Sequence, residues 1–179
     1  TKVLCAVSLQ NSVPHYIRGK NHGWLTAEYA LMPSSTVVRT QRESTSLKRS
    51  GRSVEISRLI SRTLRTIVDL NVLGERTIMV DCDVIQADGG TRTTAITGAF
   101  MALVKAQDAW LTQGIITQPF IKYPLAAISV SILNGHALLD PDYKEDSAGE
   151  ADFNFIFSDP ETVVEIQGGA EKEPIEWHS

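Results

Sequence analysis

The segment 81–98, DCDVIQADGGTRTTAITG, constrains the fold of this chain more than any other stretch, because it predicts a strand, a tight turn and a helix in direct succession. Before the turn, apolar residues alternate with more polar ones, as on one face of a half-buried strand, at Ile78, Val80, Cys82 and Val84. After it, apolar residues recur at helical spacing, at Ile96, Phe100, Leu103, Val104 and Leu111. Gly89 and Gly90 permit a tight turn and a close approach of the backbone to a ligand. The pattern therefore places two glycines at the start of a helix.

The start of this helix is a candidate phosphate site. The free N–H groups of the first turn and the positive end of the helix dipole would face a ligand over Gly90, Thr91 and Arg92, and both favour an anion. The same residues also fit a simpler interpretation, a strand-to-helix connection in which Thr93 is the N-cap. Local sequence alone favours the simpler interpretation.

A second expected helix start contains another arginine. Gly51, Arg52 and Ser53 precede a second amphipathic segment. Its apolar stripe consists of Val54, Ile56, Leu59, Ile60, Leu64, Ile67 and Val68. Two helix N-termini that each bear an arginine are able to converge on one small oxyanion, and bidentate guanidinium contacts add geometry to charge. We therefore expect Arg52 and Arg92 to face the same phosphate.

Five sequence blocks, taken in order, point to a known family. They are GWLTAEYALMP at 23–33, SGRSVEISRLISRTLR at 50–65, LGERTIMVDCDVIQADGGTRT at 73–93, ITGAF at 96–100 and YKEDSAGEADFN at 143–154. Through nearly the whole chain they resemble the ribonuclease PH family. The block DVIQADGGTRT is highly specific for this family.

The resemblance implies a phosphorolytic 3′-to-5′ exoribonuclease. Such enzymes trim the 3′ ends of transfer RNA precursors, use inorganic phosphate in place of water and release nucleoside diphosphates in a reversible reaction. The implied fold is α+β, of the ribosomal protein S5 domain 2-like type, with a mixed sheet packed against helices. The implied assembly is a homo-oligomer, a hexameric ring of three dimers. We expect residues 1–179 to form a single domain that lacks the family's N-terminal strands and C-terminal helix.

The resemblance also assigns carboxylates to the site. Asp146 and Asp152 match the family's metal-binding and catalytic aspartates, and oxygen ligands of this kind suit Mg²⁺. On the residues alone, a turn between two strands explains Asp146 and is favoured. Asp81 and Asp83 form a competing pair, because alternation places both on the less apolar face of their strand. We rank this pair below Asp146 and Asp152 as metal ligands.

The implied mechanism divides the site into two groups of residues. Arg52, the backbone amides of residues 90–92 and the hydroxyls of Thr91 and Thr93 hold the attacking phosphate near the last internucleotide linkage. A metal ion on the two aspartates neutralises charge on the scissile phosphate. Relatives commonly have a serine where this chain has Ala95, and this departure predicts weaker phosphate binding.

Charges are unevenly distributed along the chain. The formal net charge is −4 at pH 7, yet the segment 39–65 is basic. Its charged residues are Arg39, Arg42, Lys48, Arg49, Arg52, Arg58, Arg62 and Arg65, opposed by Glu43 and Glu55. Such a run alone is more often a solvated face, but by resemblance Arg39 and Arg42 match arginines of the loop that binds tRNA. The family usually has another arginine where this chain has Ser34, which predicts weaker tRNA binding.

Composition agrees with these expectations. A chain of 179 residues with 42% hydrophobic residues suits one globular domain with a core. No apolar run is long enough to cross a membrane, and no signal peptide is seen. Cys5 and Cys82 are expected to be small core residues in a reducing compartment. We therefore expect a cytoplasmic protein with no membrane partner.

The secondary structure follows from the same patterns. Beside the strand at 78–84, strands are expected at 3–9, 24–30, 125–133, 137–142, 151–157 and 162–167, with helices at 54–70 and 93–112. Gln167, Gly168 and Glu171 resemble a further family block, which we interpret as structural.

Two functions from different classes remain. The first is an active phosphorolytic exoribonuclease, and the second is a catalytically weakened, ring-forming RNA-binding scaffold subunit of the same fold. The enzyme is favoured by the joint presence of Arg52, Arg92, Asp146 and Asp152. Ser34, Ala95 and the missing family segments at the two ends are departures that count against full activity.

Overall fold

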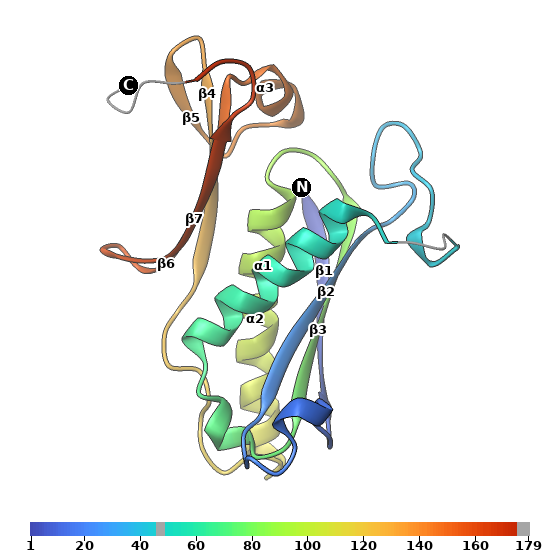
Figure 1. Cartoon of the computed structure of the whole chain (residues 1–179), viewed down its shortest axis with the longest axis vertical. Helices are drawn as coiled ribbons and strands as arrows, with labels where there is room; N and C mark the ends of the chain where they lie inside the picture. Colours follow the sequence, from blue (N-terminus) through green and yellow to red (C-terminus); the bar gives the residue numbers. More distant parts are fainter. Residues whose placement is uncertain (46–48, 175–179) are drawn as a thin grey trace.

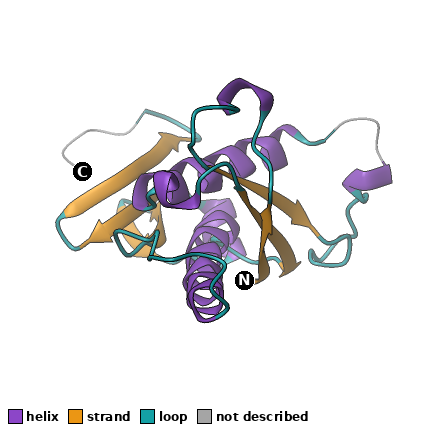
Figure 2. Ribbon diagram, turned by 90° about the horizontal axis from the view of Figure 1, so that it is seen from below, coloured by secondary structure: helices purple, strands orange, loops and turns teal. Residues whose placement is uncertain are grey.

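Two β-sheets enclose a pair of long helices in this chain. The computed structural model describes residues 1–45 and 49–174. Helices α1 (Gly51–Ile67) and α2 (Thr91–Thr112) lie between a three-stranded and a four-stranded sheet (Figure 1), and the view from below shows the same layers (Figure 2). The expected α+β class is therefore confirmed, with strands that divide between two sheets.

The three-stranded sheet is mixed. Its order is β1 (Lys2–Gln10), β3 (Thr77–Gln86) and β2 (Trp24–Leu31), with β3 antiparallel to β1 and parallel to β2. A parallel pair needs a crossover connection, and α1 provides it. The alternation in the sequence predicted correctly that Val80, Cys82 and Val84 are buried, whereas Asp81 and Asp83 are exposed.

Hydrogen bonds and strand pairing set the ends of helix α1. Ser50 is the N-cap, and its side-chain oxygen accepts from the backbone N–H of Ser53 at 3.0 Å. The helix therefore begins earlier than the predicted range 54–70. It also ends earlier, because Val68 adopts extended backbone and pairs with Ile121 in an isolated bridge.

Two buried serines attach α1 to β2. The backbone N–H groups of Ala27 and Tyr29 donate to Ser61 Oγ at 2.7 Å and to Ser57 Oγ at 3.0 Å, respectively. In the described chain β2 is an outer strand, so its outward N–H groups have no neighbouring strand to bond. The two serines lie one helical turn apart on α1, and together they accept hydrogen bonds from alternate residues of β2. They therefore fix the position of α1 along β2.

Helix α2 begins two residues before its predicted range. Its N-cap is Gly90, which has a φ of 64° and lies in the left-handed region that favours glycine. The interpretation of Thr93 as the N-cap is wrong, because Thr93 lies in the first turn and its hydroxyl donates to Gly90 O at 3.0 Å. Gly89 is needed for a different reason, since a Cβ there would overlap the Pro141 carbonyl.

The four-stranded sheet is antiparallel. Its order is β5 (His136–Leu139), β4 (Ala126–Leu133), β6 (Ala151–Asp159) and β7 (Thr162–Ala170). The residues before β6 form a short helix, α3 (Tyr143–Ala148), in place of the expected turn. Asp142 caps it, and a capping box with Glu145 explains why the predicted strand 137–142 stops early. Within residues 1–45 and 49–174 there are also three 3₁₀ helices, η1 (His15–Ile17), η2 (Glu43–Thr45) and η3 (Leu70–Leu73).

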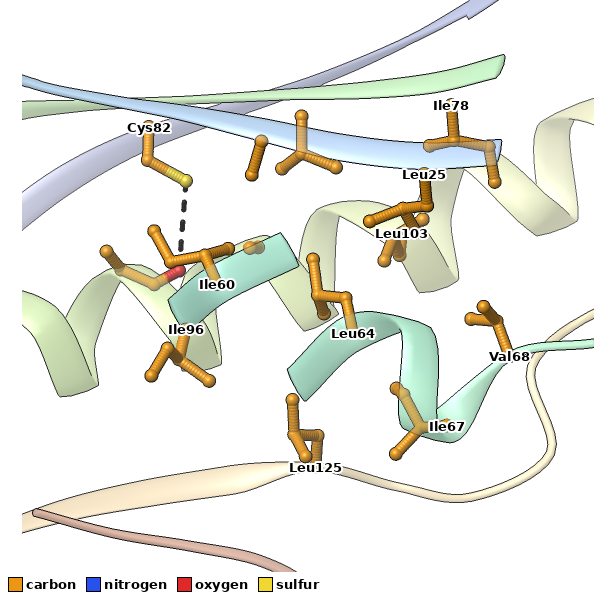
Figure 3. Close-up of a cluster of buried hydrophobic side chains, with 14 of the residues drawn as sticks. Leu25, Ile60, Leu64, Ile67, Val68, Ile78, Cys82, Ile96, Leu103 and Leu125 are labelled. Atoms are coloured by element: carbon orange, nitrogen blue, oxygen red, sulfur yellow. Dashed lines mark hydrogen bonds between the residues drawn. The ribbon is translucent and has the colours of Figure 1, made fainter. Parts of the chain in front are cut away.

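The hydrophobic core lies around the two long helices. Leu25, Ile60 and Leu103 are among its fully buried side chains (Figure 3). Cys82 belongs to this core and Cys5 packs against it, and both thiols are free, as the sequence predicts. Among residues 1–45 and 49–174, no helix combines the length and apolar character needed to cross a membrane.

Candidate functional site

The N-termini of α1 and α2 meet. Arg52, in the first turn of α1, donates from Nη2 to Thr91 Oγ1 at 3.3 Å, and Thr91 is the first residue of α2. Thr91 is buried, whereas Arg52 is exposed at the rim of this contact. The structure therefore brings together the two helix starts that the sequence predicts to converge on one anion.

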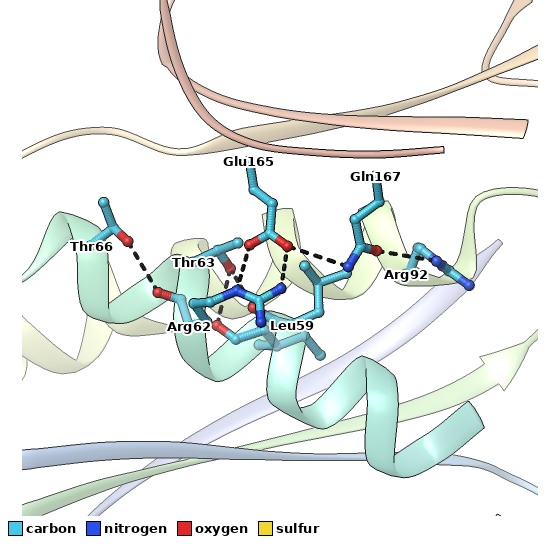
Figure 4. Close-up of polar contacts among 8 residues, drawn as sticks. Leu59, Arg62, Thr63, Thr66, Arg92, Glu165 and Gln167 are labelled. Atoms are coloured by element: carbon cyan, nitrogen blue, oxygen red, sulfur yellow. Dashed lines mark hydrogen bonds and ion pairs between the residues drawn. The ribbon is translucent and has the colours of Figure 1, made fainter. Parts of the chain in front are cut away.

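Arg92 lies between α1 and the four-stranded sheet. Its Nη2 is 3.6 Å from Glu55 Oε2, and its Nη1 donates to Gln167 Oε1 at 3.3 Å (Figure 4). Gln167 also donates from Nε2 to Glu165 Oε1 at 3.3 Å, and Glu165 forms an ion pair with Arg62 of α1. This chain of contacts joins α1, β7 and the start of α2, and so restricts the position of the Arg92 guanidinium.

A cavity of about 300 Å³ lies beside Arg92. Its lining consists of Arg92, Asp152, Asn154, Gln167, Gly168, Gly169, Ala170 and Glu171. The cavity thus joins a predicted phosphate ligand to a predicted metal ligand. Gln167 and Glu171 line the same cavity, so the interpretation of their block as structural alone is incomplete. In the sequence, the one indication that these two residues belong to the site is that their block resembles a block of the family.

Asp146 and Asp152 belong to one electrostatic cluster with the arginines. Burial raises the pKa of Asp146, and the charges of Asp152 and Glu171 raise it further. The guanidinium groups of Arg52 and Arg92 act in the opposite direction on the same pKa. Asp152, Arg52 and Arg92 therefore lie close enough to Asp146 to change its pKa.

Asp152 offers an oxygen that fits a metal ion. Its Oδ1 is buried without a hydrogen-bond partner in the described structure, while Oδ2 accepts from Asn154 Nδ2 at 3.5 Å. An unpartnered buried carboxylate oxygen is costly unless a cation or water meets it. Mg²⁺ is commonly bound by one or two carboxylates together with water and substrate phosphates. Asp146 and Asp152 fit that role, and the part of the chain that the structure describes contains no cluster of three or more ligand side chains.

Arg39 and Arg42 lie in the loop between β2 and α1, which extends away from the sheet (Figure 1). Both side chains are exposed. The loop is joined to the start of α1, because Ser53 Oγ donates to Glu43 Oε1 at 2.6 Å. Lys48, also part of the basic segment, lies outside the described residues. The loop therefore presents two arginines to solvent near the predicted phosphate site.

The competing carboxylates occupy a different place. Asp81 and Asp83 line a second cavity of about 300 Å³, together with Glu28 and Arg49. Burial raises the pKa of Asp81, and the charges of Glu28 and Asp83 add to this effect. Arg52 and Arg92 do not line this cavity. The structure therefore supports ranking Asp146 and Asp152 above this pair.

Ala95 is fully buried in the hydrophobic core, one turn inside α2. A serine hydroxyl at this position would enter the core, so the structure does not support the expectation that Ala95 weakens phosphate binding. We expect Ala95→Ser to leave the Michaelis constant for phosphate unchanged within about twofold and to lower the free energy of unfolding by about 1 kcal/mol. Steady-state kinetics and thermal unfolding would test this.

The comparison variant is Thr91→Val, which removes the hydroxyl that Arg52 contacts. It should raise the Michaelis constant for phosphate. A lower constant in Ala95→Ser would contradict the burial argument and restore the sequence-based expectation.

Family models match both parts of the chain. The model of the 3′ exoribonuclease family, domain 1, matches residues 1–107, and the model of domain 2 matches residues 123–175. Similar proteins named "Ribonuclease PH" come from Neisseria meningitidis serogroup C, 51% identical over 97% of this chain and 72% of the relative, and from Maricaulis maris, 51% identical over 98% of this chain and 74% of the relative.

Solved structures share the fold at lower identity. Rice (Oryza sativa) Rrp46 superposes with a TM-score of 0.70 at 21% identity, covering 96% of this chain and 70% of that one. A chain of the Archaeoglobus fulgidus exosome with RNA bound to the active site gives a TM-score of 0.74 at 19% identity, covering 97% and 70%. These structures show the fold, whereas the family models and the sequence relatives identify the family. The chain therefore belongs to the ribonuclease PH family of phosphorolytic 3′-to-5′ exoribonucleases.

Proposed function

We propose that this chain trims the 3′ ends of tRNA precursors by phosphorolysis at the site formed by the starts of α1 and α2. The observation that supports this most is the contact between Arg52 and Thr91, which joins two helix N-termini beside the cavity of Arg92 and Asp152. Two dipole ends and two guanidinium groups favour an anion as small as orthophosphate. The same side chains would be of little use to a scaffold that performs no chemistry.

Two arginines and the backbone amides of α2 would position the attacking orthophosphate. Arg52 and Arg92, with the backbone amides at the start of α2, would hold orthophosphate near the last internucleotide linkage of the RNA. One oxygen of the orthophosphate then bonds to the phosphorus of that linkage. At the same time, the bond between this phosphorus and the 3′ oxygen of the preceding ribose breaks. The terminal nucleotide leaves as a nucleoside 5′-diphosphate. One phosphate linkage replaces another, so the reaction runs in both directions.

Asp146 and Asp152 would hold Mg²⁺ at this site. The fit is supported by Asp152 Oδ1, which has no hydrogen-bond partner in the described structure, and by the charge of Asp152, which raises the pKa of Asp146. When bound, the ion supplies positive charge that stabilises the charge developing on the scissile phosphate. Asn154 donates to Asp152 Oδ2 and so orients the carboxylate.

RNA would reach the site past the loop of Arg39 and Arg42. Both are exposed, and arginines in such a loop bind phosphates of the RNA backbone. We further propose a hexameric ring of three dimers in the cytoplasm. The structural neighbours come from exosome cores, which supports an oligomer, and the two free cysteines agree with a reducing compartment.

The direct test is to incubate the protein with a 3′-extended tRNA and Mg²⁺, with and without phosphate. We expect nucleoside diphosphates only when phosphate is present, and extension of RNA ends when nucleoside diphosphates are in excess. A chelator should stop both reactions. Nucleoside monophosphates as products would indicate hydrolysis and would contradict the proposal.

Ser34 provides a separate prediction for RNA binding. Ser34 is exposed in the loop that contains Arg39 and Arg42, so Ser34→Arg should add one phosphate contact. We expect tRNA to bind about fivefold more tightly and the log–log salt slope to steepen by about one. Binding titrations at several salt concentrations measure both quantities.

The matched control is Ser12→Arg, which adds the same charge at an exposed position outside this loop. It should change the affinity and the slope less. Equal effects of the two variants would mean that net charge, and not the loop, sets RNA affinity.

A further inference from the structure

Cys5 and Cys82 lie directly opposite one another in the three-stranded sheet. Cys5 of β1 pairs with Cys82 of β3 in antiparallel register, and their sulfur atoms are 3.7 Å apart. Directly opposed residues of antiparallel strands have Cα atoms about 4.5–5.5 Å apart, within the range of about 4.4–6.8 Å that a disulfide needs. The backbone therefore already suits a bond between these two sulfurs. They are also the two cysteines of the whole sequence.

The two thiols differ in accessibility and acidity. Cys5 is half-buried on β1, at one edge of its sheet, whereas Cys82 is 1% exposed. Contact with the Cys82 thiol lowers the pKa of Cys5. The hydrogen bond with Cys5, followed by burial, raises the pKa of Cys82. Cys5 is thus suited to react first with an oxidant from solution, and Cys82 to complete the bond.

Both sulfurs also contact the start of α2. Each lies 3.9 Å from the carbonyl oxygen of Ala95, and the contact of Cys82 is drawn in Figure 3. A Cβ at Gly98 would lie 2.9 Å from the Cys5 sulfur, so the glycine makes room for this thiol. Ala95 follows the first turn, which contains Thr91 and Arg92. The sulfur pair therefore packs beneath the turn that faces the phosphate site.

We propose that Cys5 and Cys82 are a redox modification site, which forms a reversible cross-strand disulfide beneath the first turn of α2. The oxidant is a small disulfide such as oxidised glutathione. The Cys5 thiolate attacks one of its sulfur atoms, forms a mixed disulfide and releases one glutathione. The Cys82 sulfur, having lost its proton, then attacks Cys5 and releases the second glutathione. Two protein thiols and one oxidised glutathione thus become one protein disulfide and two reduced glutathiones.

The bond changes the packing below α2. The sulfur separation must shorten to about 2.05 Å, which draws the sulfurs toward each other and changes their contact with Ala95. The start of α2 shifts with this contact. This consequence rests on the proposed function, because it concerns phosphate binding at Thr91 and Arg92.

The chemical test uses the whole protein and a mass spectrometer. We expect oxidised glutathione to lower the intact mass by about 2 Da and to reduce the thiol count after denaturation from two to none. Dithiothreitol should restore both values. The disulfide should also raise the melting temperature by about 5 °C or more. Two retained thiols, a stable glutathione adduct, or disulfide-linked pairs of chains on a non-reducing gel would each overturn the proposal.

The single variants Cys5→Ser and Cys82→Ser separate the two steps. Neither can form the internal bond, so neither should show the 2-Da loss or the rise in melting temperature. Cys82→Ser should retain a mixed disulfide on Cys5, whereas Cys5→Ser should react much more slowly because Cys82 is buried. Faster reaction at Cys82 than at Cys5 would contradict the assigned order.

The link to the phosphate site has its own readout. We expect the oxidised protein to show a change of about twofold or more in the Michaelis constant for phosphate, and Cys5→Ser treated in the same way to show none. An unchanged constant in the fully oxidised protein would refute the link. If neither form consumed phosphate, the proposed function would fail, while the mass measurement would still decide the disulfide.

Discussion

Asp152→Asn is expected to lower the rate of phosphorolysis by about 10²–10³-fold with little loss of stability. The substitution keeps the shape of the side chain but removes the negative charge that would hold Mg²⁺. Of the two carboxylate oxygens, Oδ1 is buried without a hydrogen-bond partner in the described structure, and Oδ2 accepts from Asn154. Rates at saturating RNA and phosphate, measured across a range of Mg²⁺ concentrations, test this.

The expected pattern is a lower maximal rate and a higher Mg²⁺ concentration at half-maximal activity. Asp159→Asn is the matched control, because Asp159 ends the same strand and its carboxylate accepts from Glu161 in the β6–β7 turn, away from the cavity. The control should retain activity within about twofold. If Asp152→Asn needed no more Mg²⁺ than the parent protein, Asp152 would not be a metal ligand.

Arg52→Gln should raise the Michaelis constant for phosphate by about 10- to 100-fold, because one charge-assisted hydrogen bond to the anion is lost. Glutamine ends two bonds short of the Nη2 atom that contacts Thr91, so the substitution removes this contact together with the charge and leaves an uncharged polar side chain. The Michaelis constant for RNA should change much less. Initial rates at varied phosphate and fixed RNA measure the effect.

Arg58→Gln is the matched control for this prediction. Arg58 lies on the same helix and is exposed, and it does not line the cavity beside Arg92. It loses the same charge, so any general effect of charge on RNA binding should appear in both variants. Equal changes in the phosphate constant would mean that Arg52 acts at a distance and does not bind the anion.

Periodicity and cap residues predicted most of the fold. Every expected strand and both long helices are present, because alternation and helical spacing are local signals. The errors lie at element ends and before β6, where the short helix α3 replaces the expected turn. Thr93 was a good N-cap by residue type, yet Gly90 caps the helix because it adopts a positive φ. The strand expected at 137–142 stops at Leu139, because Asp142 begins a capped helix.

The site was predictable only in part, because its partners are far apart in sequence. Arg52 and Arg92 stand at helix starts, where local pattern and resemblance both identify them. The contacts of Arg92 with Glu55 and Gln167 depend on how β7 packs against α1, and neither segment encodes that alone. The burial of Ala95 depends in the same way on the sheet beneath α2, and the sequence alone does not reveal that this side chain enters the core.

The serines that join α1 to β2 also limit how this chain can change in length. Ser57 and Ser61 bond fixed positions of the strand, so they set the rotational phase of the whole helix. An inserted residue between Arg52 and Ser57 would turn the guanidinium by about 100° around the axis and advance it by about 1.5 Å. It would then point away from Thr91. Insertions in the loop before Ser50 should therefore be tolerated, whereas an insertion between Arg52 and Ser57 should abolish catalysis.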